Sequence, residues 1–236
     1  MLKSELYKLF YSRAFTIALS VMVALNAAIC WLIARDGTPD LSLIAAPWNV
    51  PALFSLSIGA IHVTNEYANN TMRTTVLEAP RRGRVFAAKL VALTLYLTLW
   101  IAALMAISAV AILIAAPQAD AFVENTALTL IEFLYAIVMI GLMGAGLGFL
   151  TRGTAPSIVA GFGILFLSSV LVLIPLDFFE TVYPKFLIPN TVNQIVSTSG
   201  LPEHLAYSRG VSTLILLAYP IIFCAAGLLR FLKSDV

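Results

Sequence analysis

Residues 127–150 read ALTLIEFLYAIVMIGLMGAGLGFL and contain a single charged side chain, that of Glu132. As an α-helix rising 1.5 Å per residue, this stretch is about 36 Å long, enough to cross the ~30 Å hydrocarbon core of a bilayer. A helix is expected because lipid offers no hydrogen-bond partners to free backbone groups. A second apolar stretch, 154–174, follows after a tight turn at 151–153. Consecutive helices that cross a membrane therefore decide the fold class.

The rest of the chain has the same character, since 61% of its 236 residues are hydrophobic and only 11% are charged. A soluble domain is nearer half apolar and a quarter charged, so this chain lacks the polar surface that a globule in water needs. We therefore expect an all-α, polytopic membrane protein in which residues 1–236 form one transmembrane domain. The six expected spans are about 14–34, 44–64, 88–115, 127–150, 154–174 and 210–229.

Lysine and arginine indicate the orientation of these spans, because cytoplasmic loops carry an excess of both. Of the 14 basic residues, 11 fall on the side that holds both ends of the chain. The other side holds Arg35, Lys185 and Arg209. Trp31 and Trp48 fall at that other interface, where amphipathic rings gather. We expect both termini in the cytoplasm (N-in, C-in) and a location in the cytoplasmic membrane of a prokaryote.

Residues 1–13 separate apolar from polar side chains at helical spacing. The apolar members are Leu2, Leu6, Leu9 and Phe10, and the members on other faces are Lys3, Glu5, Lys8 and Ser12. This pattern predicts an amphipathic helix in the cytoplasmic interface, with its lysines near anionic lipid. The side chains that we assign to this interfacial role are Lys3, Leu6, Lys8 and Phe10. The simpler alternative is a positive flank that only sets the topology.

The segment 175–209 between the last two spans is longer than most loops, and such segments are usually structured or functional. Three prolines interrupt it: Pro184, Pro189 and Pro202. We expect short helices packed over the outer mouth of the bundle. Pro175 should end the fifth span, and Pro220 should kink the last one.

No motif for catalysis or cofactor binding stands out. The sequence lacks the G-x-x-x-x-G-K-[ST] phosphate loop, the H-E-x-x-H zinc motif and the G-x-S-x-G elbow, and His62 and His204 fall on opposite sides of the membrane. We therefore expect no catalytic residue, no cofactor and no metal in this chain. Cys30 and Cys224 should lie at different depths, which argues against a disulfide. A net charge of +2 is too small to indicate a nucleic-acid partner.

The polar loop 65–87 after the second span is the most informative part of the chain. Asn69-Asn70 supplies a turn, since Asn tolerates the left-handed conformation, and Thr71 can cap a short helix, 71–79, that Pro80 stops. A two-turn helix is unstable alone in water, so it must dock on something. A basic cluster then leads into the third span; it comprises Arg81, Arg82 and Arg84. The alternative, a loop that only sets topology, explains the arginines but not the apolar face of the short helix.

This loop resembles the signature of the type-2 (ABC-2) exporter permeases, in which a Glu precedes a Gly-Thr turn, a short Leu-rich helix, a Pro and a basic residue. The matching residues here are Glu66, Thr71, Arg73, Leu77, Pro80 and Arg82. The opening Lys-Ser-Glu-Leu-x-Lys-Leu at 3–9 is similar to that of the family's smaller members, which include permeases that confer immunity to peptide antibiotics. Asn70 departs from the pattern, because the family often has Gly there, although Asn can adopt the same turn.

The resemblance implies a permease subunit that pairs with a second copy or a related permease and meets an ATP-binding cassette ATPase on the cytoplasmic face. ATP and Mg would bind to the ATPase chain. The residues that it implies in coupling to that ATPase are Glu66, Thr71, Met72, Arg73, Val76, Leu77, Glu78, Pro80 and Arg82. Glu66 would be an electrostatic anchor, with an arginine of the same region as its candidate partner. The alternative for Glu66 is a solvated charge at a helix end.

Several side chains inside the expected spans are candidates for a substrate path. Glu132 could face a water-filled outer cavity, snorkel to the interface, or pair with a residue of the outer segment. The aromatic candidates are Trp100, Tyr96, Tyr219 and Phe223, for each of which core packing is the simpler interpretation. Asn26 is expected to form a hydrogen bond across a helix pair. A face of small residues, Gly141, Gly144, Ala145 and Gly148, should allow close helix packing.

We expect the chain to be the membrane-spanning permease subunit of an exporter for a hydrophobic or amphipathic substrate, such as a drug, an antibiotic peptide or a lipid-like molecule. The partner chain would hydrolyse ATP, so the subunit itself is not expected to be an enzyme. An ion-coupled secondary transporter or channel is the first alternative, and it predicts ionisable groups near the midplane or paired broken helices. A non-transporting membrane anchor for an ATPase or sensor is the second.

Overall fold

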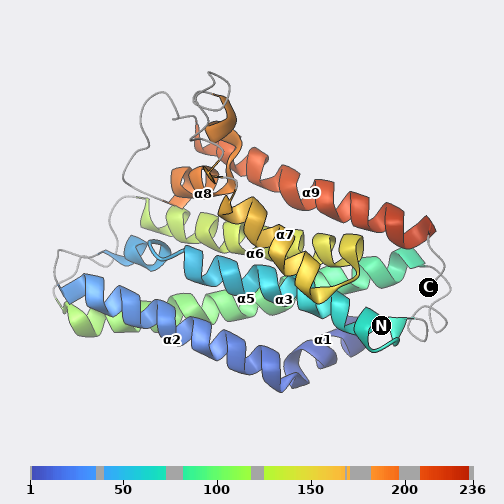
Figure 1. Cartoon of the computed structure of the whole chain (residues 1–236). Helices are drawn as coiled ribbons and strands as arrows, with labels where there is room; N and C mark the ends of the chain where they lie inside the picture. The colour runs from blue at the N-terminus through green and yellow to red at the C-terminus, as the bar shows by residue number, and fades with distance from the viewer. Residues whose placement is uncertain are drawn as a thin grey trace.

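The computed structural model describes residues 2–35, 40–72, 82–117, 125–167, 169–170, 182–196 and 208–233. Every regular element in these ranges is a helix (Figure 1), which confirms the all-α class. The α-helices are α1 (Leu2–Tyr11), α2 (Arg13–Arg35), α3 (Asn49–Ala68), α5 (Arg82–Ala115), α6 (Thr126–Thr151), α7 (Thr154–Leu165), α8 (Ile188–Val196) and α9 (Arg209–Lys233), and the 3₁₀ helices are η1 (Leu41–Ala45) and η4 (Tyr183–Phe186).

In the part of the chain that the structure describes, four helices are long and apolar enough to cross a membrane: α2, α5, α6 and α9. They have between 23 and 34 residues, whereas a span requires about 20, and they indicate a membrane protein. The remaining two expected spans fall on α3 and α7. α3 has 20 residues, but its last turns carry the polar side chains of His62, Asn65 and Glu66. The count of six spans therefore stays a prediction.

The fifth expected span, 154–174, is longer than the helix that the structure places there. α7 ends at Leu165 after 12 residues, too few to cross a bilayer. Gly161 and Gly163 lie in its C-terminal part, and glycine is about 1 kcal/mol less favourable than alanine inside a helix. Phe166 then leaves helical backbone angles, with φ of −121°. Pro175, the residue expected to end this span, lies outside the described residues.

The second expected span, 44–64, is displaced toward the C-terminus in the structure. η1 and a turn occupy its first residues, and α3 begins at Asn49. A helix that began at residue 44 would hold Pro51 in its interior, where the missing N–H removes a backbone hydrogen bond. In α3 Pro51 lies in the first turn, where no such bond is lost. The proline thus sets the start of the helix.

α6 is the central helix of the bundle, and its neighbours include α3 and α9 (Figure 1). Glycines bring the backbones together, since a Cβ on Gly144 would lie 2.2 Å from the carbonyl oxygen of Leu56 on α3. On another side of α6, a Cβ on Gly146 would lie 2.7 Å from the backbone of Cys224 on α9. The close packing expected of the small face is confirmed; its members Gly141, Gly144, Ala145 and Gly148 are all buried.

Asn26 connects α2 to α5 inside the bundle. Its side chain is fully buried and donates hydrogen bonds from Nδ2 to Ser108 Oγ at 3.1 Å and to the Ile44 carbonyl of η1 at 3.4 Å. The hydrogen bond expected across a helix pair is therefore confirmed. In an apolar surrounding such a bond also favours one helix register over its alternatives, because a shift would leave the amide without partners.

Short helices lie over one end of the bundle, as expected for part of 175–209. α8 lies at the end opposite α1 (Figure 1) and buries Ile188, Val192 and Ile195. Trp48 Nε1 ahead of α3 donates a hydrogen bond to Asn193 Oδ1 on α8 at 2.7 Å. α9, which follows, continues as a helix through Pro220, the residue expected to kink it.

The two ends of the chain lie at one end of the bundle, together with the end of α3, the start of α5 and the turn between α6 and α7 (Figure 1). We call this the basic end. Its lysines and arginines within the described ranges are Lys3, Lys8, Arg13, Arg82, Arg84, Lys89, Arg152, Arg230 and Lys233. The elements at the other end contribute Arg35, Lys185 and Arg209. The asymmetry of charge along the sequence is thus an asymmetry between the two ends of the folded bundle.

Candidate functional site

Five ionisable side chains meet at the basic end and form what we call the charge cluster. They are Glu5 and Lys8 of α1, His62 and Glu66 of α3, and Lys89 of α5. Lys89 is fully buried, and Glu5, His62 and Glu66 are 2%, 5% and 7% exposed. Charged side chains are almost never this buried unless they are paired, so the cluster is the first candidate for a functional site.

The two carboxylates of the charge cluster each lie between the same two ammonium groups. Lys89 Nζ is 2.8 Å from Glu5 Oε2 and 2.7 Å from Glu66 Oε1. Lys8 Nζ is 2.9 Å from Glu5 Oε1 and 2.6 Å from Glu66 Oε1. His62 Nε2 lies 3.6 Å from Glu5 Oε2. With a neutral imidazole, two negative and two positive charges balance.

Local structure positions each member of the charge cluster. Glu5 and Leu9, one turn apart on α1, face inward and are buried. His62 and Glu66 are also one turn apart, so they share a face of α3. Lys89 lies two turns inside α5, which is why its ammonium is enclosed by other helices rather than by solvent.

A left-handed turn fixes the end of α3 directly after Glu66. Asn70 has a φ of 53°, its N–H donates to the Tyr67 carbonyl at 3.2 Å, and the Thr71 N–H donates to the Glu66 carbonyl at 3.0 Å. This pair of bonds is the Schellman motif. It confirms the turn expected at Asn69-Asn70, and it holds the backbone of Glu66 while its side chain joins the charge cluster.

The contacts within the charge cluster keep Glu5 and Lys8 ionised at neutral pH. Burial alone would raise the pKa of the Glu5 carboxyl, but the ammonium of Lys89, with further bonds from Lys8 and the nearby His62, holds that pKa below its usual value. Burial alone would lower the pKa of the Lys8 ammonium, but its hydrogen bonds to Glu66 and Glu5 raise that pKa. The attraction between opposite charges outweighs the loss of water for both groups.

Among the described residues, the cations paired with Glu66 are two lysines of other helices, Lys8 and Lys89. The pairing of Glu66 with an arginine of its own region stays a prediction, because Arg73 and Arg81 lie outside the described residues. Glu5, expected on another face of the N-terminal helix than the apolar one, is buried in the bundle. Of the residues assigned to the interfacial role, Lys3 and Phe10 are exposed, Leu6 is partly buried and Lys8 is drawn to the charge cluster.

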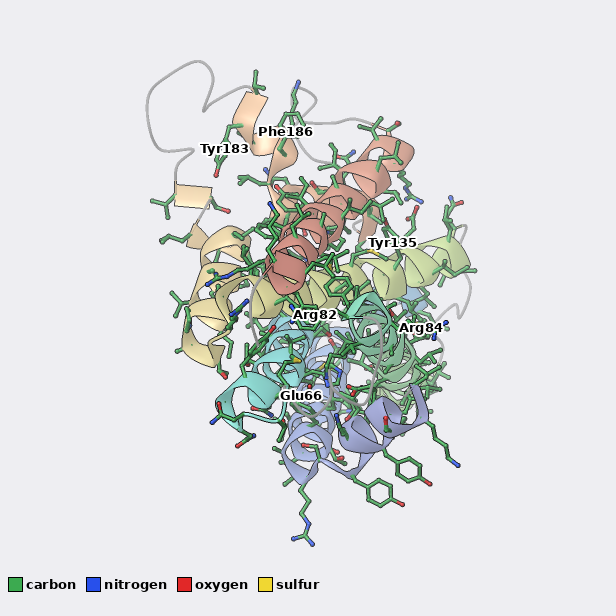
Figure 2. The ribbon with its side chains drawn as sticks, turned by 90° about the vertical axis from the view of Figure 1, so that its right-hand side faces the viewer. Glu66, Arg82, Arg84, Tyr135, Tyr183 and Phe186 are labelled. Carbon is green, nitrogen blue, oxygen red and sulfur yellow. The ribbon has the colours of Figure 1, made fainter. Side chains whose placement is uncertain are left out.

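α5 begins earlier than the third expected span, 88–115, and its first turns make a second contact at the basic end. Arg82 Nη1 lies 3.3 Å from the carbonyl oxygens of Phe231 and Leu232, in the last turn of α9. An arginine at the C-terminus of a helix satisfies free carbonyls and offsets the helix dipole. Figure 2, viewed from the basic end, shows Arg82 toward α9 and Arg84 at the edge of the bundle.

Aromatic and basic side chains around Arg82 connect α5, α6 and α9. The Phe149 ring of α6 lies 4.6 Å from Phe86 of α5 and 5.4 Å from Phe231 of α9, between ring centres. Arg230 of α9 donates a hydrogen bond to the Leu150 carbonyl at the end of α6. We call Arg82, Phe86, Phe149, Arg230 and Phe231 the clasp. α5 thus takes part in both the charge cluster and the clasp.

The expected coupling residues lie partly outside the described structure. Arg73, Val76, Leu77, Glu78 and Pro80 belong to residues 73–81, which are not described, so the short helix at 71–79 stays a prediction. Thr71 closes the cap of α3, and Met72 is buried. The loop expected at 65–87 is shorter than that, because α3 runs to Ala68 and α5 starts at Arg82.

The aromatic residues of the expected substrate path contact different neighbours in the structure. Tyr96 of α5 is buried with its ring edge-on to Phe10, 4.9 Å between centres, and near Trp100. On α9, Tyr219 donates a hydrogen bond to the Phe186 carbonyl at 2.5 Å, and Phe223 packs on Gly146. Among the described residues these aromatics pack within the bundle, as the simpler interpretation predicts.

Glu132 of α6 lies near a cation at the end opposite the charge cluster. Its Oε2 is 3.9 Å from Arg209 Nη1 at the start of α9. Arg209 is the last residue of the outer segment as expected from the sequence, so the pairing alternative for Glu132 is the one that the structure shows. Within the described residues no group of three or more His, Cys, Asp or Glu side chains could hold a metal ion.

Comparison with protein families shows where the chain belongs. A family model with the description "Protein of unknown function (DUF2705)" matches residues 33–236. The matched region includes His62, Glu66 and Lys89, while Glu5 and Lys8 precede it. A search of curated proteins found no match to the chain.

Proposed function

Because the chain belongs to the DUF2705 family, whose description states no function, we propose from its sequence and its site that it is the membrane-spanning permease subunit of an ATP-binding cassette exporter. It carries a hydrophobic or amphipathic substrate across the cytoplasmic membrane of a prokaryote. A separate chain binds and hydrolyses ATP. The resemblance of residues 66–82 to the ABC-2 signature suggests the class of transporter. The contacts around these residues support a way in which movement of the ATPase could reach the helices.

The observation that carries this proposal is that the two helix ends on either side of residues 73–81 are both attached to neighbouring helices. They leave from the capped end of α3, where Glu66 joins the charge cluster, and they enter α5 at Arg82, which contacts α9. A force on 73–81 therefore reaches two helix ends that are both fixed to their neighbours. A loop that only set topology would not need either attachment.

α5 is suited to transmit such a force through the membrane. Its 34 residues give a continuous helix about 51 Å long, with Arg82 in its first turn and Lys89 two turns on. Near its other end Ser108 accepts the hydrogen bond of Asn26. Displacement of its first turn at the basic end is therefore carried to the opposite side of the bundle.

The charge cluster makes α1 follow that movement. If α5 shifted alone, Lys89 would leave Glu5 and Glu66, and breaking a buried ion pair costs about 3–5 kcal/mol. The half-exposed ammonium of Lys8 can adapt, because its side chain is 47% exposed. We infer that α1, α3 and α5 move together when an ATPase docks on 73–81 and closes around ATP.

In this proposal the basic end faces the cytoplasm, where the ATPase lies, and six spans place both termini there. α3 supplies the second span, and the fifth span requires the residues that follow Leu165 in addition to α7, whose 12 residues alone are too few. A second copy or a related permease pairs with this bundle. The excess of lysine and arginine at the basic end supports this orientation.

Copurification tests the proposal directly. The genes beside that of this chain are searched for a phosphate-loop ATPase. The chain is expressed with the ATPase found there, purified in nanodiscs, and assayed for ATP hydrolysis with candidate amphipathic substrates. The expected result is a stable complex whose ATPase activity rises with substrate. Movement of substrate by the chain alone, driven by an ion gradient, would favour the secondary transporter and sink the proposal.

A further inference from the structure

Three arginines gather around one tyrosine at the basic end, where α3, α6 and α9 end and α5 begins (Figure 1). The arginines are Arg82, Arg152 and Arg230, and the tyrosine is Tyr67 in the last turn of α3. We call these four residues the arginine site. It lies beside the charge cluster but shares no residue with it.

Short contacts join the members of the arginine site across the helix ends. The guanidinium carbon of Arg152 lies 5.5 Å from the centre of the Tyr67 ring. Arg230 donates a hydrogen bond to a carbonyl at the end of α6, two residues before Arg152. Arg82 contacts the carbonyls of the two residues that follow Arg230. Carbonyls and an aromatic ring position these side chains without cancelling their positive charge.

The hydroxyl of Tyr67 is buried and has no hydrogen-bond partner among the described residues. Buried hydroxyls in native proteins nearly always have one. Burial raises the pKa of this hydroxyl, and the charges of all three arginines oppose that rise, so each of them acts at its oxygen. Glu66 also acts there, but its carboxylate is paired with the two lysines of the charge cluster. The hydroxyl is thus a hydrogen-bond donor in a positive electrostatic field.

We propose that the arginine site binds a phosphate group, which accepts a hydrogen bond from the Tyr67 hydroxyl and pairs with the guanidinium groups of Arg152 and Arg230. A phosphate brings three strong acceptor oxygens and about two negative charges, and arginine binds it through two parallel hydrogen bonds. A carboxylate brings one charge and two oxygens, which one such arginine already satisfies. Several cations with a hydroxyl therefore favour phosphate.

The position of the arginine site suits two sources of phosphate. Arg152 lies in the turn between α6 and α7, and Arg230 is exposed in the last turn of α9. Both are therefore at the level where the expected spans end, which is where phospholipid headgroups lie and where soluble phosphate compounds of the cytoplasm have access. The phosphate comes from one of these two sources. This binding site does not depend on the proposed transport function.

Thermal unfolding of the purified full chain tests the site with inorganic phosphate as the probe. Melting temperatures are measured at pH 7 in sodium phosphate and in sodium chloride of the same ionic strength. Phosphate should raise the melting temperature in a saturable way, and Tyr67→Phe should bind it about ten-fold more weakly, the scale of one hydrogen bond to a charged group. In chloride, Tyr67→Phe should be at least as stable as the unsubstituted chain, because it removes a buried hydroxyl that lacks a partner.

Matched variants separate the arginine site from the general positive charge of this end. Arg152→Gln should weaken phosphate binding about ten-fold or more. Arg84→Gln, which removes a positive charge from an exposed position at the same end, should change it less than about two-fold. Tyr11→Phe, at a tyrosine that is 77% exposed, is the control for loss of a hydroxyl and should have no effect.

Native mass spectrometry of the same variants distinguishes the two sources of phosphate. The chain is stripped of lipid in detergent and titrated with phosphatidylglycerol or phosphatidylcholine that carry the same acyl chains. Preferential binding of phosphatidylglycerol that Tyr67→Phe and Arg152→Gln abolish would assign the site to a lipid headgroup. A response of the melting temperature to inorganic phosphate without that preference would assign it to a soluble phosphate compound.

Equal responses to phosphate and to both lipids by the unsubstituted chain, Tyr67→Phe and Arg152→Gln would overturn the proposal. So would an equal loss of binding with Arg152→Gln and Arg84→Gln. If the variants weakened a complex with an ATPase and left phosphate and lipid binding unchanged, the arginines would instead contact acidic side chains of that partner.

Discussion

Lys89 Nζ lies 2.7 Å from Glu66 Oε1 although the two residues belong to different helices and both side chains are buried. The same ammonium lies 2.8 Å from Glu5 Oε2 on a third helix. One lysine therefore bridges two buried carboxylates, which it neutralises together with Lys8, and connects α1, α3 and α5. Its loss should be felt by all three helices.

We expect Lys89→Met to lower the free energy of unfolding by about 3–5 kcal/mol, because it leaves buried carboxylates short of a counter-charge. Lys8→Met is the matched control. Lys8 contacts the same two carboxylates, but its side chain is 47% exposed, so water can replace part of its charge and its loss should cost less than that of Lys89. Denaturant unfolding of each purified variant in the same detergent gives both numbers. Equal losses of unfolding free energy in the two variants would show that the burial of Lys89 does not determine how much it stabilises the fold.

The pH dependence of stability should be flat near neutrality and fall at both extremes. The pKa of Glu5 is lowered from 4.5, so its contribution is present above pH 4.5 and is lost as the pH falls through the lowered value. The pKa of Lys8 is raised from 10.5, so its contribution is present below pH 10.5 and is lost as the pH rises through the raised value.

Thermal unfolding of the chain and of Glu5→Gln over a pH series measures the acid limb. The difference in melting temperature between the two should be constant near pH 7 and shrink below pH 4.5, where the carboxylate takes up a proton. A difference that stayed constant down to the lowest pH would mean that the charge of Glu5 does not stabilise the fold.

The helices of this protein can be predicted from its sequence more readily than the charge cluster can. Apolar length predicts α2, α5, α6 and α9, because a bilayer demands about 20 such residues whatever lies beside them. Helical spacing predicts that residues 2–11 form a helix, but it does not say which face packs on the bundle. Glu5 belongs to the polar residues of this pattern, and yet it is buried in the bundle.

One signal in the sequence does point to the charge cluster. Lys89 falls inside the expected span 88–115, where a charge is costly and requires a partner. The acids expected on the same side include Glu5 and Glu66, so the pairing could have been proposed. The length of α7 was harder to predict, because the apolar run through 174 hides the weak helix propensity of Gly161 and Gly163.

Close contact between α3 and α6 should make Gly144 intolerant of a side chain. A Cβ there would lie 2.2 Å from the Leu56 carbonyl oxygen, which belongs to the backbone, so the helices must separate. We expect Gly144→Ala to destabilise the fold by about 1–3 kcal/mol through overpacking. Gly163→Ala is the control, since nothing lies within 4 Å of a Cβ at that helix position. It should be neutral, or stabilising by up to about 1 kcal/mol, in the same unfolding assay. A tolerated Gly144→Ala would contradict the packing of these two helices.

Arg82 should be required for coupling to an ATPase, and Arg84 should not. Arg82 is in contact with two carbonyl oxygens at the end of α9. Arg84, two residues further along α5, is exposed. If movement of 73–81 reaches α9 through the clasp, Arg82→Gln should reduce substrate-stimulated ATP hydrolysis about ten-fold, the scale of one or two charged hydrogen bonds. Arg84→Gln keeps the clasp intact and should retain the stimulation.

The measurement is ATP hydrolysis by the copurified complex, with and without substrate, for both variants. Basal hydrolysis and the melting temperature of each complex separate lost coupling from lost folding, because a misfolded permease would lower all three readings together. Equal stimulation in the two variants would mean that the contact of Arg82 with α9 plays no part in transmission. If only Arg84→Gln lost the stimulation by substrate, the coupling contact would lie on the exposed face of α5. Arg84 would then bind the ATPase subunit, and the contact of Arg82 with α9 would not be needed.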